Sequence, residues 1–386
     1  MRSWPGSRRR PPNWTRRALR PNRGAPQRPR FLIQVVADEA DRLSAGEARV
    51  TMIVDLRRLR PVLLGLAVAA CAPVSNGAGA DPLADRSAAL VAHAAQADGV
   101  LGACIVDRHG AACANGDRPI SMQSVMKLLV GMAVLDAVDQ GRLTLDDEVL
   151  LTRDDVSVFV QPLEKLIGPD GHRTTVGELI RGAITESDSL ATDWLIDRLG
   201  GTAAVQAYLD RKGIVGVRLD RDERRLQTEI FGLTWSAEFT DPDRLDAAID
   251  AVPPDRREAA FRAYQNDVRD TATPRGLATL LYRLGDGQLL SAGSTRWILD
   301  VMGETGTFPD RLRAGTPADW WIGHKTGSSS SWDGVVGVTN DVGVMRAPDG
   351  AVIGVVALLA NSSAPAPERA AAIAGVSRIA AETHRP

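Results

Sequence analysis

Residues 122–140 read MQSVMKLLVGMAVLDAVDQ, a helical pattern that is apolar on almost every side. A helix that is hydrophobic all round is buried inside a domain. The stretch also contains Ser124 and Lys127, spaced i and i+3, so both side chains lie on one face of the helix. A buried amine must be neutral or paired, because removing an isolated charge from water is costly. We therefore predict a buried helix on which the Lys127 amine can reach the Ser124 hydroxyl.

The chain has β-rich segments at both ends of its body and helical periodicity between them. The strands that we expect are 100–106, 111–114, 320–324, 334–345 and 351–360. The helices that we expect are 83–96, 122–140, 176–185, 190–198, 276–284, 291–302 and 367–381. Residues 214–235 lack a clear period and are expected to be a long loop. This order predicts an α/β domain built from 81–120 and 270–386, with an all-helical domain at 121–269 inserted into it.

Residues 1–51 predict a disordered leader, or sequence that lies upstream of the true start. The first 30 residues contain ten arginines, six prolines and no acidic residue. Repulsion between these charges and the stiff X-Pro steps prevent a packed core. A nucleic-acid-binding arm is the less favoured alternative.

Residues 52–80 have the pattern of a secretory signal. The basic segment RRLR at 57–60 precedes a nine-residue apolar stretch, which is too short to span a membrane. Ala78-Gly79-Ala80 is a small-residue cleavage site, whereas Val68-Ala69-Ala70-Cys71 resembles a bacterial lipobox that would leave Cys71 lipidated. Both alternatives stay open. Each predicts an exported protein, either periplasmic or secreted after cleavage, or held by a lipid anchor.

The charge of the chain is divided unevenly. The whole chain carries −2, and residues 1–80 hold 15 arginines against 5 acidic residues, so residues 81–386 carry −12. An acidic body disfavours nucleic acid and anionic membranes as partners. No apolar stretch reaches the ~18 residues of a membrane span. We expect a monomer without a membrane-spanning segment.

Cys104 and Cys113 remain once Cys71 is removed or acylated, and export places them in an oxidising compartment. They flank a predicted hairpin whose turn lies at Arg108-His109. In that register the two thiols face each other, so we predict a disulfide. The alternative is a pair of small buried apolar residues. The five histidines are scattered without metal-binding spacing, so we expect no metal site.

Three short motifs stand in order: Ser124-Val125-Met126-Lys127, Ser187-Asp188-Ser189 and Lys325-Thr326-Gly327. The chain contains only four lysines against 42 arginines, yet two of the four lie in these motifs. Lysine can lose its proton when it is desolvated and act as a base, whereas arginine cannot. The other two, Lys165 and Lys212, are expected to be solvated surface residues. The positions of Lys127 and Lys325 therefore indicate chemistry rather than surface charge.

With these motifs in place, residues 83–382 resemble the class A β-lactamases, whose signature is S-x-x-K, S-D-N and K-T-G. Further segments of similarity are 218–223 (like the family's Ω-loop), 270–275, 314–320 and 339–343. The resemblance implies the β-lactamase/transpeptidase-like fold, an antiparallel sheet flanked by helices with an inserted helical domain. It also implies a serine hydrolase that opens the β-lactam amide of penicillins or cephalosporins without a cofactor.

The resemblance implies four catalytic residues. Ser124 resembles the acylated nucleophile, and Lys127 resembles the motif lysine that shares the role of general base with Glu223. Ser187 is similar to the serine that passes a proton to the departing lactam nitrogen. Glu223 would activate the water that hydrolyses the acyl-enzyme. Backbone N–H groups of Ser124 and Ser328 would form the oxyanion hole.

The resemblance also implies a substrate-binding set: Ser189, Gln227, Lys325, Thr326, Gly327 and Ser328. Lys325 would attract the substrate carboxylate and keep Ser187 polarised. Ser189 and Gln227 depart from the family pattern, which has asparagine at both positions. Serine is shorter than asparagine, and the extra methylene of Gln227 reaches toward the place of the deacylating water. We therefore expect slow deacylation.

Three alternatives are weighed against a β-lactamase. A penicillin-binding DD-peptidase also uses serine, lysine and K-T-G, but it lacks the Ω-loop carboxylate that Glu223 resembles. A penicillin-acylated sensor usually carries membrane spans and a signalling domain. A lactamase-like protein of low activity would be consistent with Ser189 and Gln227.

Overall fold

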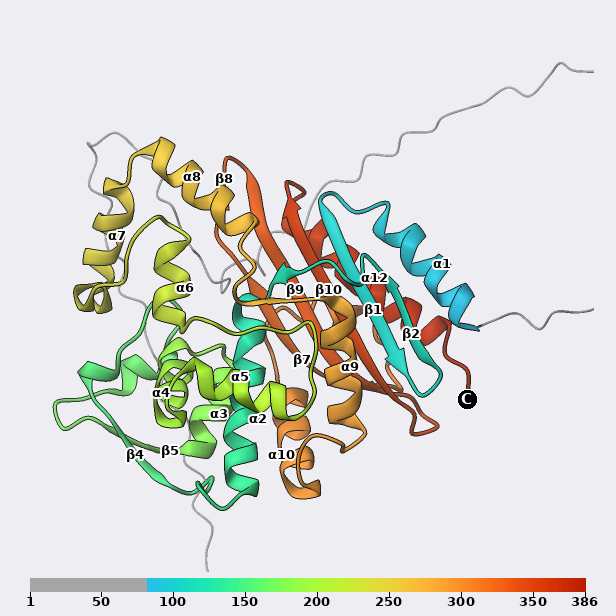
Figure 1. The fold of residues 1–386 in the computed structure, drawn as a ribbon, viewed down its shortest axis with the longest axis horizontal. Helices are drawn as coiled ribbons and strands as arrows, with labels where there is room; N and C mark the ends of the chain where they lie inside the picture. The colour runs from blue at the N-terminus through green and yellow to red at the C-terminus, as the bar shows by residue number, and fades with distance from the viewer. Residues whose placement is uncertain (1–81) are drawn as a thin grey trace, which may run out of the picture. The chain divides into compact units, whose positions relative to one another are not determined.

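The computed structural model describes residues 82–386, whose centre is a six-stranded antiparallel sheet (Figure 1). The predicted leader, the signal segment and the lipobox at Cys71 lie outside the described residues. The strands are β1 (Val100–Asp107), β2 (Gly110–Ala114), β7 (Trp321–Ser328), β8 (Ser331–Trp332), β9 (Val335–Arg346) and β10 (Val352–Ser362). Their order is β2-β1-β10-β9-β7, and β8 pairs with β9. The amino-terminal hairpin therefore lies beside the carboxy-terminal strand, as the predicted α/β domain requires.

Alternating side chains cover the two faces of this sheet, as period-2 strand geometry requires. Leu101, Ala103 and Ile105 of β1 pack with α1 (Pro82–Ala94), α11 (Leu312–Gly315) and α12 (Ala366–Glu382). Cys104 and Val106 face the opposite core. That core is formed with α2 (Met126–Asp139), α9 (Pro274–Gly285) and α10 (Ala292–Gly303). Figure 1 shows α1 and α12 on the side of the sheet away from α9 and α2.

The β1–β2 hairpin confirms the predicted register and disulfide. Asp107 pairs with Gly110 across the turn, and Cys104 pairs with Cys113. The two thiols are joined in a disulfide. Two facing cysteines in adjacent antiparallel strands need no backbone rearrangement to bond, because their Cβ atoms already lie on the same face.

Residues 121–269 are mainly helical. Their elements besides α2 are η1 (Gln123–Val125), η2 (Arg153–Asp155), η3 (Pro162–Leu166), α3 (Val176–Thr185), α4 (Ser189–Leu199), α5 (Thr202–Arg211), α6 (Glu223–Glu229), η4 (Ala237–Thr240), α7 (Pro242–Ala251) and α8 (Pro254–Gln265). The buried helix predicted at 122–140 is confirmed: every residue of α2 from Met126 to Ala137 is buried. The boundaries of the predicted domains stay a prediction.

Three local expectations are wrong. The segment 121–269 is not all-helical, because β4 (Glu148–Leu151) pairs with β5 (His172–Thr175). Short strands that pair with a distant segment leave no helical or alternating period for sequence analysis to detect. Residues 214–235 contain α6, which Asp222 caps by accepting a hydrogen bond from Arg225 N. The strand expected at 320–324 continues through the K-T-G motif to Ser328, since backbone pairing with β9 extends it.

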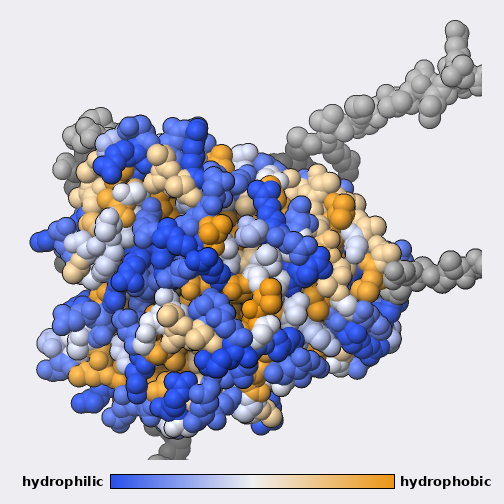
Figure 2. Space-filling view, viewed as in Figure 1, coloured by the Kyte–Doolittle hydropathy of each residue, from blue (hydrophilic) through white to orange (hydrophobic). Residues whose placement is uncertain are grey.

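A further short sheet joins the two ends of the helical segment. β3 (Ile120–Ser121) enters it and β6 (Thr271–Ala272) leaves it, and the two strands pair antiparallel. Hydrophilic residues cover most of the face drawn in Figure 2, and hydrophobic residues there form small groups. Among residues 82–386, no helix combines the length and hydrophobicity needed to cross a bilayer.

We predict that replacing both Cys104 and Cys113 with alanine lowers the free energy of unfolding by about 2–3 kcal/mol, because the disulfide closes a short loop in the unfolded chain. Urea unfolding of residues 82–386 measures the change. Wild-type protein in reducing buffer is the matched control and should lose the same amount. Equal midpoints for oxidised wild type and variant would contradict a stabilising role.

Candidate active site

The predicted nucleophile lies where the helical segment meets the sheet. Ser124 belongs to the 3-10 turn η1, and the α-helix starts at Met126, four residues later than the start expected at residue 122. Gln123, directly before it, has a left-handed backbone (φ 50°). This conformation is rare for non-glycine residues and concentrates at functional sites. Ser124 is half-buried, and Lys127 follows in the first turn of α2 with 1% of its surface exposed.

Gly327 explains how the K-T-G strand comes close to this turn. A Cβ atom at Gly327 would lie 2.6 Å from the Met122 carbonyl oxygen and 3.3 Å from the backbone nitrogen of Val125. Only glycine therefore allows β7 to pass so near to η1. The close approach brings the Lys325-Thr326-Gly327 motif beside the Ser124 motif.

Lys127 is a paired buried amine. Its Nζ donates to the Ser187 carbonyl oxygen (2.6 Å) and to Ser189 Oγ (3.0 Å), and it lies 3.5 Å from Glu223 Oε1. An ammonium group has three N–H donors, of which two are used in these hydrogen bonds, and the Glu223 carboxylate adds an ion-pair contact. The structure therefore brings the first two motifs and Glu223 together around one amine.

Glu223 is the first residue of α6 and is also almost fully buried. Its Oε2 accepts hydrogen bonds from Gln227 Nε2 (3.1 Å) and Ser189 Oγ (3.4 Å). Its Oε1 is buried without a hydrogen-bond partner. One carboxylate oxygen is thus held in place while the other remains available to accept a proton.

Asp193 is a buried residue behind Glu223 that the sequence analysis missed. Its Oδ1 accepts the backbone N–H of Glu223 (2.8 Å), and its Oδ2 accepts Ser157 Oγ (2.5 Å). Burial raises the pKa of Asp193 to about 7, and the negative charges of Asp222 and Glu223 add to the shift. Asp193 lies one helical turn after Ser189, a spacing that indicates a shared face of α4 but not what that face contacts.

A hydrogen-bond chain runs from Glu223 to the carboxy-terminal end of α8. Gln227 Nε2 donates to Gln123 Oε1 (2.9 Å) as well as to Glu223. Gln123 Nε2 donates to the Tyr264 hydroxyl (2.8 Å), which in turn donates to Ser121 Oγ (3.0 Å). The amide nitrogen of Gln227 is therefore held by hydrogen bonds to both Glu223 and Gln123. Gln123, which directly precedes Ser124, belongs to the same network.

Lys325 and Ser187 form the second pair of the site. Lys325 Nζ donates to Ser187 Oγ (3.1 Å) and to the Thr326 carbonyl oxygen (3.0 Å), and its side chain is fully buried. Desolvation, together with the positive charge of Lys127, lowers the pKa of Lys325 to about 7. Ser187 has a left-handed backbone (φ 61°), so a strained residue contacts both lysines: Lys127 through its carbonyl oxygen and Lys325 through its hydroxyl.

Arg311 is a second residue that sequence analysis missed. Its guanidinium donates to the Gly327 carbonyl oxygen (3.2 Å) and to Ser328 Oγ (2.8 Å), at the exposed end of β7. Burial lowers its pKa to about 10. Thr326, also on β7, has its Oγ1 2.8 Å from Oγ1 of Thr307. One arginine among 42 has no distinguishing pattern in the sequence.

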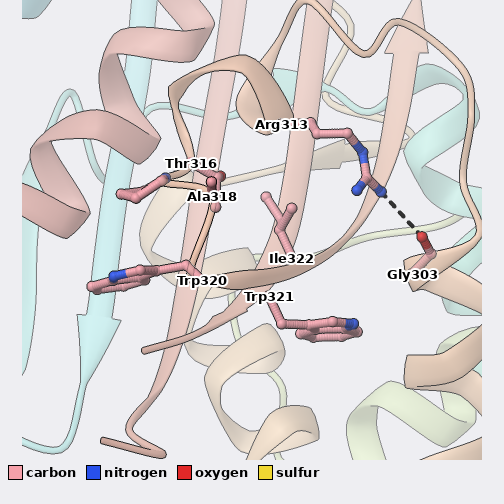
Figure 3. Close-up of a pocket in the computed structure, with 8 residues that line it drawn as sticks. Gly303, Arg313, Thr316, Ala318, Trp320, Trp321 and Ile322 are labelled. Atoms are coloured by element: carbon pink, nitrogen blue, oxygen red, sulfur yellow. Dashed lines mark hydrogen bonds between the residues drawn. The ribbon is translucent and has the colours of Figure 1, made fainter. Parts of the chain in front are cut away.

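A cavity of about 320 Å³ lies at the opposite end of β7, and its lining contains none of the predicted site residues. Figure 3 shows Ile322 between Trp320 on one side and Arg313 on the other, and the Arg313 guanidinium donates to the Gly303 carbonyl oxygen (3.1 Å). Among residues 82–386, no group of three or more His, Cys, Asp or Glu side chains could hold a metal ion.

Known proteins with similar sequences include β-lactamases. The profile of the β-lactamase enzyme family matches residues 82–384. The β-lactamase of Streptomyces albus G is 31% identical over 270 residues, which are 69% of this chain and 74% of that protein. β-Lactamase VEB-1 of Pseudomonas aeruginosa is 28% identical over 250 residues, 64% of this chain and 72% of that protein.

Solved structures agree with the sequence relatives. An ancestral class A β-lactamase (GNCA) has a TM-score of 0.61 at 33% identity, over 78% of this chain and all of that one (100%). A β-lactamase from Chitinophaga pinensis has a TM-score of 0.63 at 27% identity, over 77% and 98% of the two chains. The resemblance and the fold expected from it are confirmed. The chain belongs to the β-lactamase enzyme family, in class A, and is a hydrolase that acts on β-lactams.

Proposed function

We propose that the protein hydrolyses the β-lactam amide of penicillins and cephalosporins through an acyl-enzyme on Ser124. The observation that carries this proposal is the buried Lys127 amine, one helical turn after Ser124 and 3.5 Å from the Glu223 carboxylate. In its neutral form this amine accepts the proton of Ser124 as the hydroxyl oxygen attacks the lactam carbonyl carbon. Backbone N–H groups of Ser124 and Ser328 would stabilise the oxyanion, each by about 3 kcal/mol.

The lactam C–N bond then breaks, and its nitrogen needs a proton. Ser187 supports that role because its hydroxyl accepts a hydrogen bond from Lys325. Ser187 gives its own proton to the nitrogen and is reprotonated from a neighbouring lysine. Ser187 has a left-handed backbone, and it contacts both lysines: its carbonyl oxygen accepts from Lys127 and its hydroxyl accepts from Lys325.

Hydrolysis of the acyl-enzyme is assigned to Glu223. A water molecule loses a proton to the carboxylate and its oxygen attacks the ester carbon. The ester C–O bond then breaks, Ser124 takes a proton from Lys127, and the proton on Glu223 returns to Lys127. Glu223 Oε1 suits this step because it is buried and has no hydrogen-bond partner. The hydrogen bonds to Oε2 keep the other oxygen oriented during both steps.

The carboxylate of the substrate would bind at the exposed end of β7. Lys325, Thr326 and Ser328 lie along this strand, as the resemblance implies. Arg311 adds a second positive charge there through its hydrogen bond to Ser328. We also propose that the protein acts after export, in the periplasm or outside the cell, where β-lactams are met.

We predict that Ser124→Ala abolishes turnover of a chromogenic cephalosporin and that Glu223→Gln accumulates a covalent adduct. The amide of Glu223→Gln cannot take a proton from water, so deacylation slows by about a hundredfold or more. Intact-mass spectrometry and stopped-flow absorbance measure adduct and turnover. Stoichiometric labelling of wild type without turnover would instead indicate a penicillin-binding peptidase or a sensor.

We predict that kcat/KM falls as pH rises through about 7, because Lys325 loses its positive charge there and attracts the substrate carboxylate less. The limiting slope is about tenfold per pH unit for one ionisation. Lys325→Arg is the matched variant, since arginine stays charged across this range and should remove the fall. An unchanged alkaline limb in Lys325→Arg would assign the fall to another group.

We predict slow deacylation in the wild type and faster deacylation in Gln227→Asn. Shortening the side chain by one methylene clears space beside Glu223 while it keeps the amide donor. Single-turnover mass spectrometry of the adduct should show a several-fold faster decay, with Gln227→Ala as the control that removes the amide. Fast turnover of wild type without any detectable adduct would contradict this prediction.

A further inference from the structure

The two positions at which the chain departs from the family motifs contact the same atom. Ser189 Oγ donates to Glu223 Oε2 (3.4 Å), and Gln227 Nε2 donates to that oxygen as well (3.1 Å). Ser189 Oγ also accepts a hydrogen bond from Lys127 Nζ (3.0 Å). Ser189 thus bridges the amine and the carboxylate on which the proposed mechanism depends.

The amine and the carboxylate are not hydrogen-bonded to each other directly. Lys127 Nζ lies 3.5 Å from Glu223 Oε1, which has no hydrogen-bond partner, whereas Ser189 Oγ is hydrogen-bonded to both the amine (3.0 Å) and Glu223 Oε2 (3.4 Å). A hydroxyl can accept one proton and donate another at the same moment, because it carries both an O–H and two lone pairs. The amide of an asparagine, the family residue at this position, has no O–H to exchange.

The fold holds Ser189 rigidly and keeps it dry. Ser189 is the first residue of α4 and has 2% of its surface exposed. The preceding residue, Asp188, caps the helix: its two carboxylate oxygens accept the backbone N–H groups of Ala191 and Leu163 (both 2.8 Å). The Ser189 backbone N–H donates to the Val160 carbonyl oxygen (2.7 Å). Its hydroxyl is therefore positioned by main-chain contacts on both sides.

We propose that the Ser189 hydroxyl transfers a proton from Lys127 to Glu223 before acylation. An N–H bond of the Lys127 ammonium breaks as the proton binds Ser189 Oγ, and the original O–H proton of Ser189 moves to Glu223 Oε2. The products are a neutral Lys127 amine and a protonated Glu223, with Ser189 unchanged. The neutral amine then accepts the proton of Ser124. This inference rests on the proposed function and adds a proton path to it.

The same path serves deacylation in reverse. After acylation Lys127 carries the proton of Ser124 until it reprotonates Ser187, which has given its own proton to the lactam nitrogen. Glu223 must return to the carboxylate form before it can accept a proton from water. Transfer from Glu223 Oε2 through Ser189 Oγ to the now neutral Lys127 restores it. Ser189 therefore couples the two halves of the reaction.

The test compares Ser189→Thr with Ser189→Val, which have nearly the same shape and differ in the hydroxyl. Both fill the position and exclude water, but only threonine can pass a proton. We expect Ser189→Thr to acylate at saturating cephalosporin within about threefold of wild type, and Ser189→Val to be slower by at least about tenfold. Stopped-flow single-turnover measurements in H2O and D2O give the acylation rate constant and its solvent isotope effect.

Thr192→Val is the matched control for loss of a buried hydroxyl on the same helix. Thr192 Oγ1 donates to the Asp188 carbonyl oxygen (2.6 Å). Thr192→Val should lower the melting temperature without changing the acylation rate constant. If Ser189→Val fails to fold, Ser189→Ala replaces it and is likewise expected to acylate more slowly than Ser189→Thr.

Each outcome separates the proton path from the function. Equal acylation rate constants and isotope effects in the threonine and valine variants overturn the path, even when the wild type forms its adduct. If Ser189 only bound the substrate, Ser189→Val would raise the dissociation constant of the substrate and leave the acylation rate constant at saturation unchanged. That result also overturns the path. A wild type that forms no adduct on Ser124 overturns the proposed function together with this inference.

Discussion

The amines of Lys127 and Lys325 and the carboxylate of Glu223 share one buried site. The contacts that surround this site are those that stabilise buried charges. Lys127 and Lys325 are both inaccessible to solvent, and the only nearby carboxylate that contacts either amine in the described residues is that of Glu223. Desolvation penalises each cation, and the two cations repel each other. Hydrogen-bond acceptors offset this cost: the Ser187 carbonyl oxygen accepts from Lys127, and the Ser187 hydroxyl and the Thr326 carbonyl oxygen accept from Lys325. The result is a lysine, Lys325, that titrates near neutral pH.

The position of Glu223 depends on an ion-pair network away from the reacting groups. Arg221, two residues before Glu223, donates through Nε to Asp270 Oδ2 (2.6 Å), and Asp270 Oδ1 accepts the backbone N–H groups of Asp220 (2.7 Å) and Arg221 (2.9 Å). Asp270 directly precedes β6, so the segment before α6 is tied to the strand that leaves the helical region. Asp193 then fixes the first turn of α6 from the other side. The segment before α6 and Asp193 of α4 together hold the Glu223 carboxylate beside the Lys127 amine.

Much of the site could be predicted because it is encoded locally. Ser124 and Lys127 are one helical turn apart, so their proximity requires only that the helix form. Cys104 and Cys113 face each other because a two-residue turn sets the register of the hairpin. Arg311 and Asp193 could not be found in the same way, since their residue types are common and their partners lie far along the chain. The direction of the Ser189 hydroxyl, which bridges Lys127 and Glu223, could not be predicted from the sequence either.

The sequence alone determined the order of the motifs, the buried helix, the hairpin with its cysteine pair and the membership of the family that the motifs resemble. These features depend on spacing and periodicity within short segments. The tertiary structure alone decided that Ser189 and Gln227 meet on one oxygen of Glu223, that Gly327 lets β7 pass beside η1, and that K-T-G continues a strand. Contacts between residues tens of positions apart depend on how the elements pack, because hydrogen-bond geometry is set to within tenths of an ångström by neighbours that no local pattern specifies.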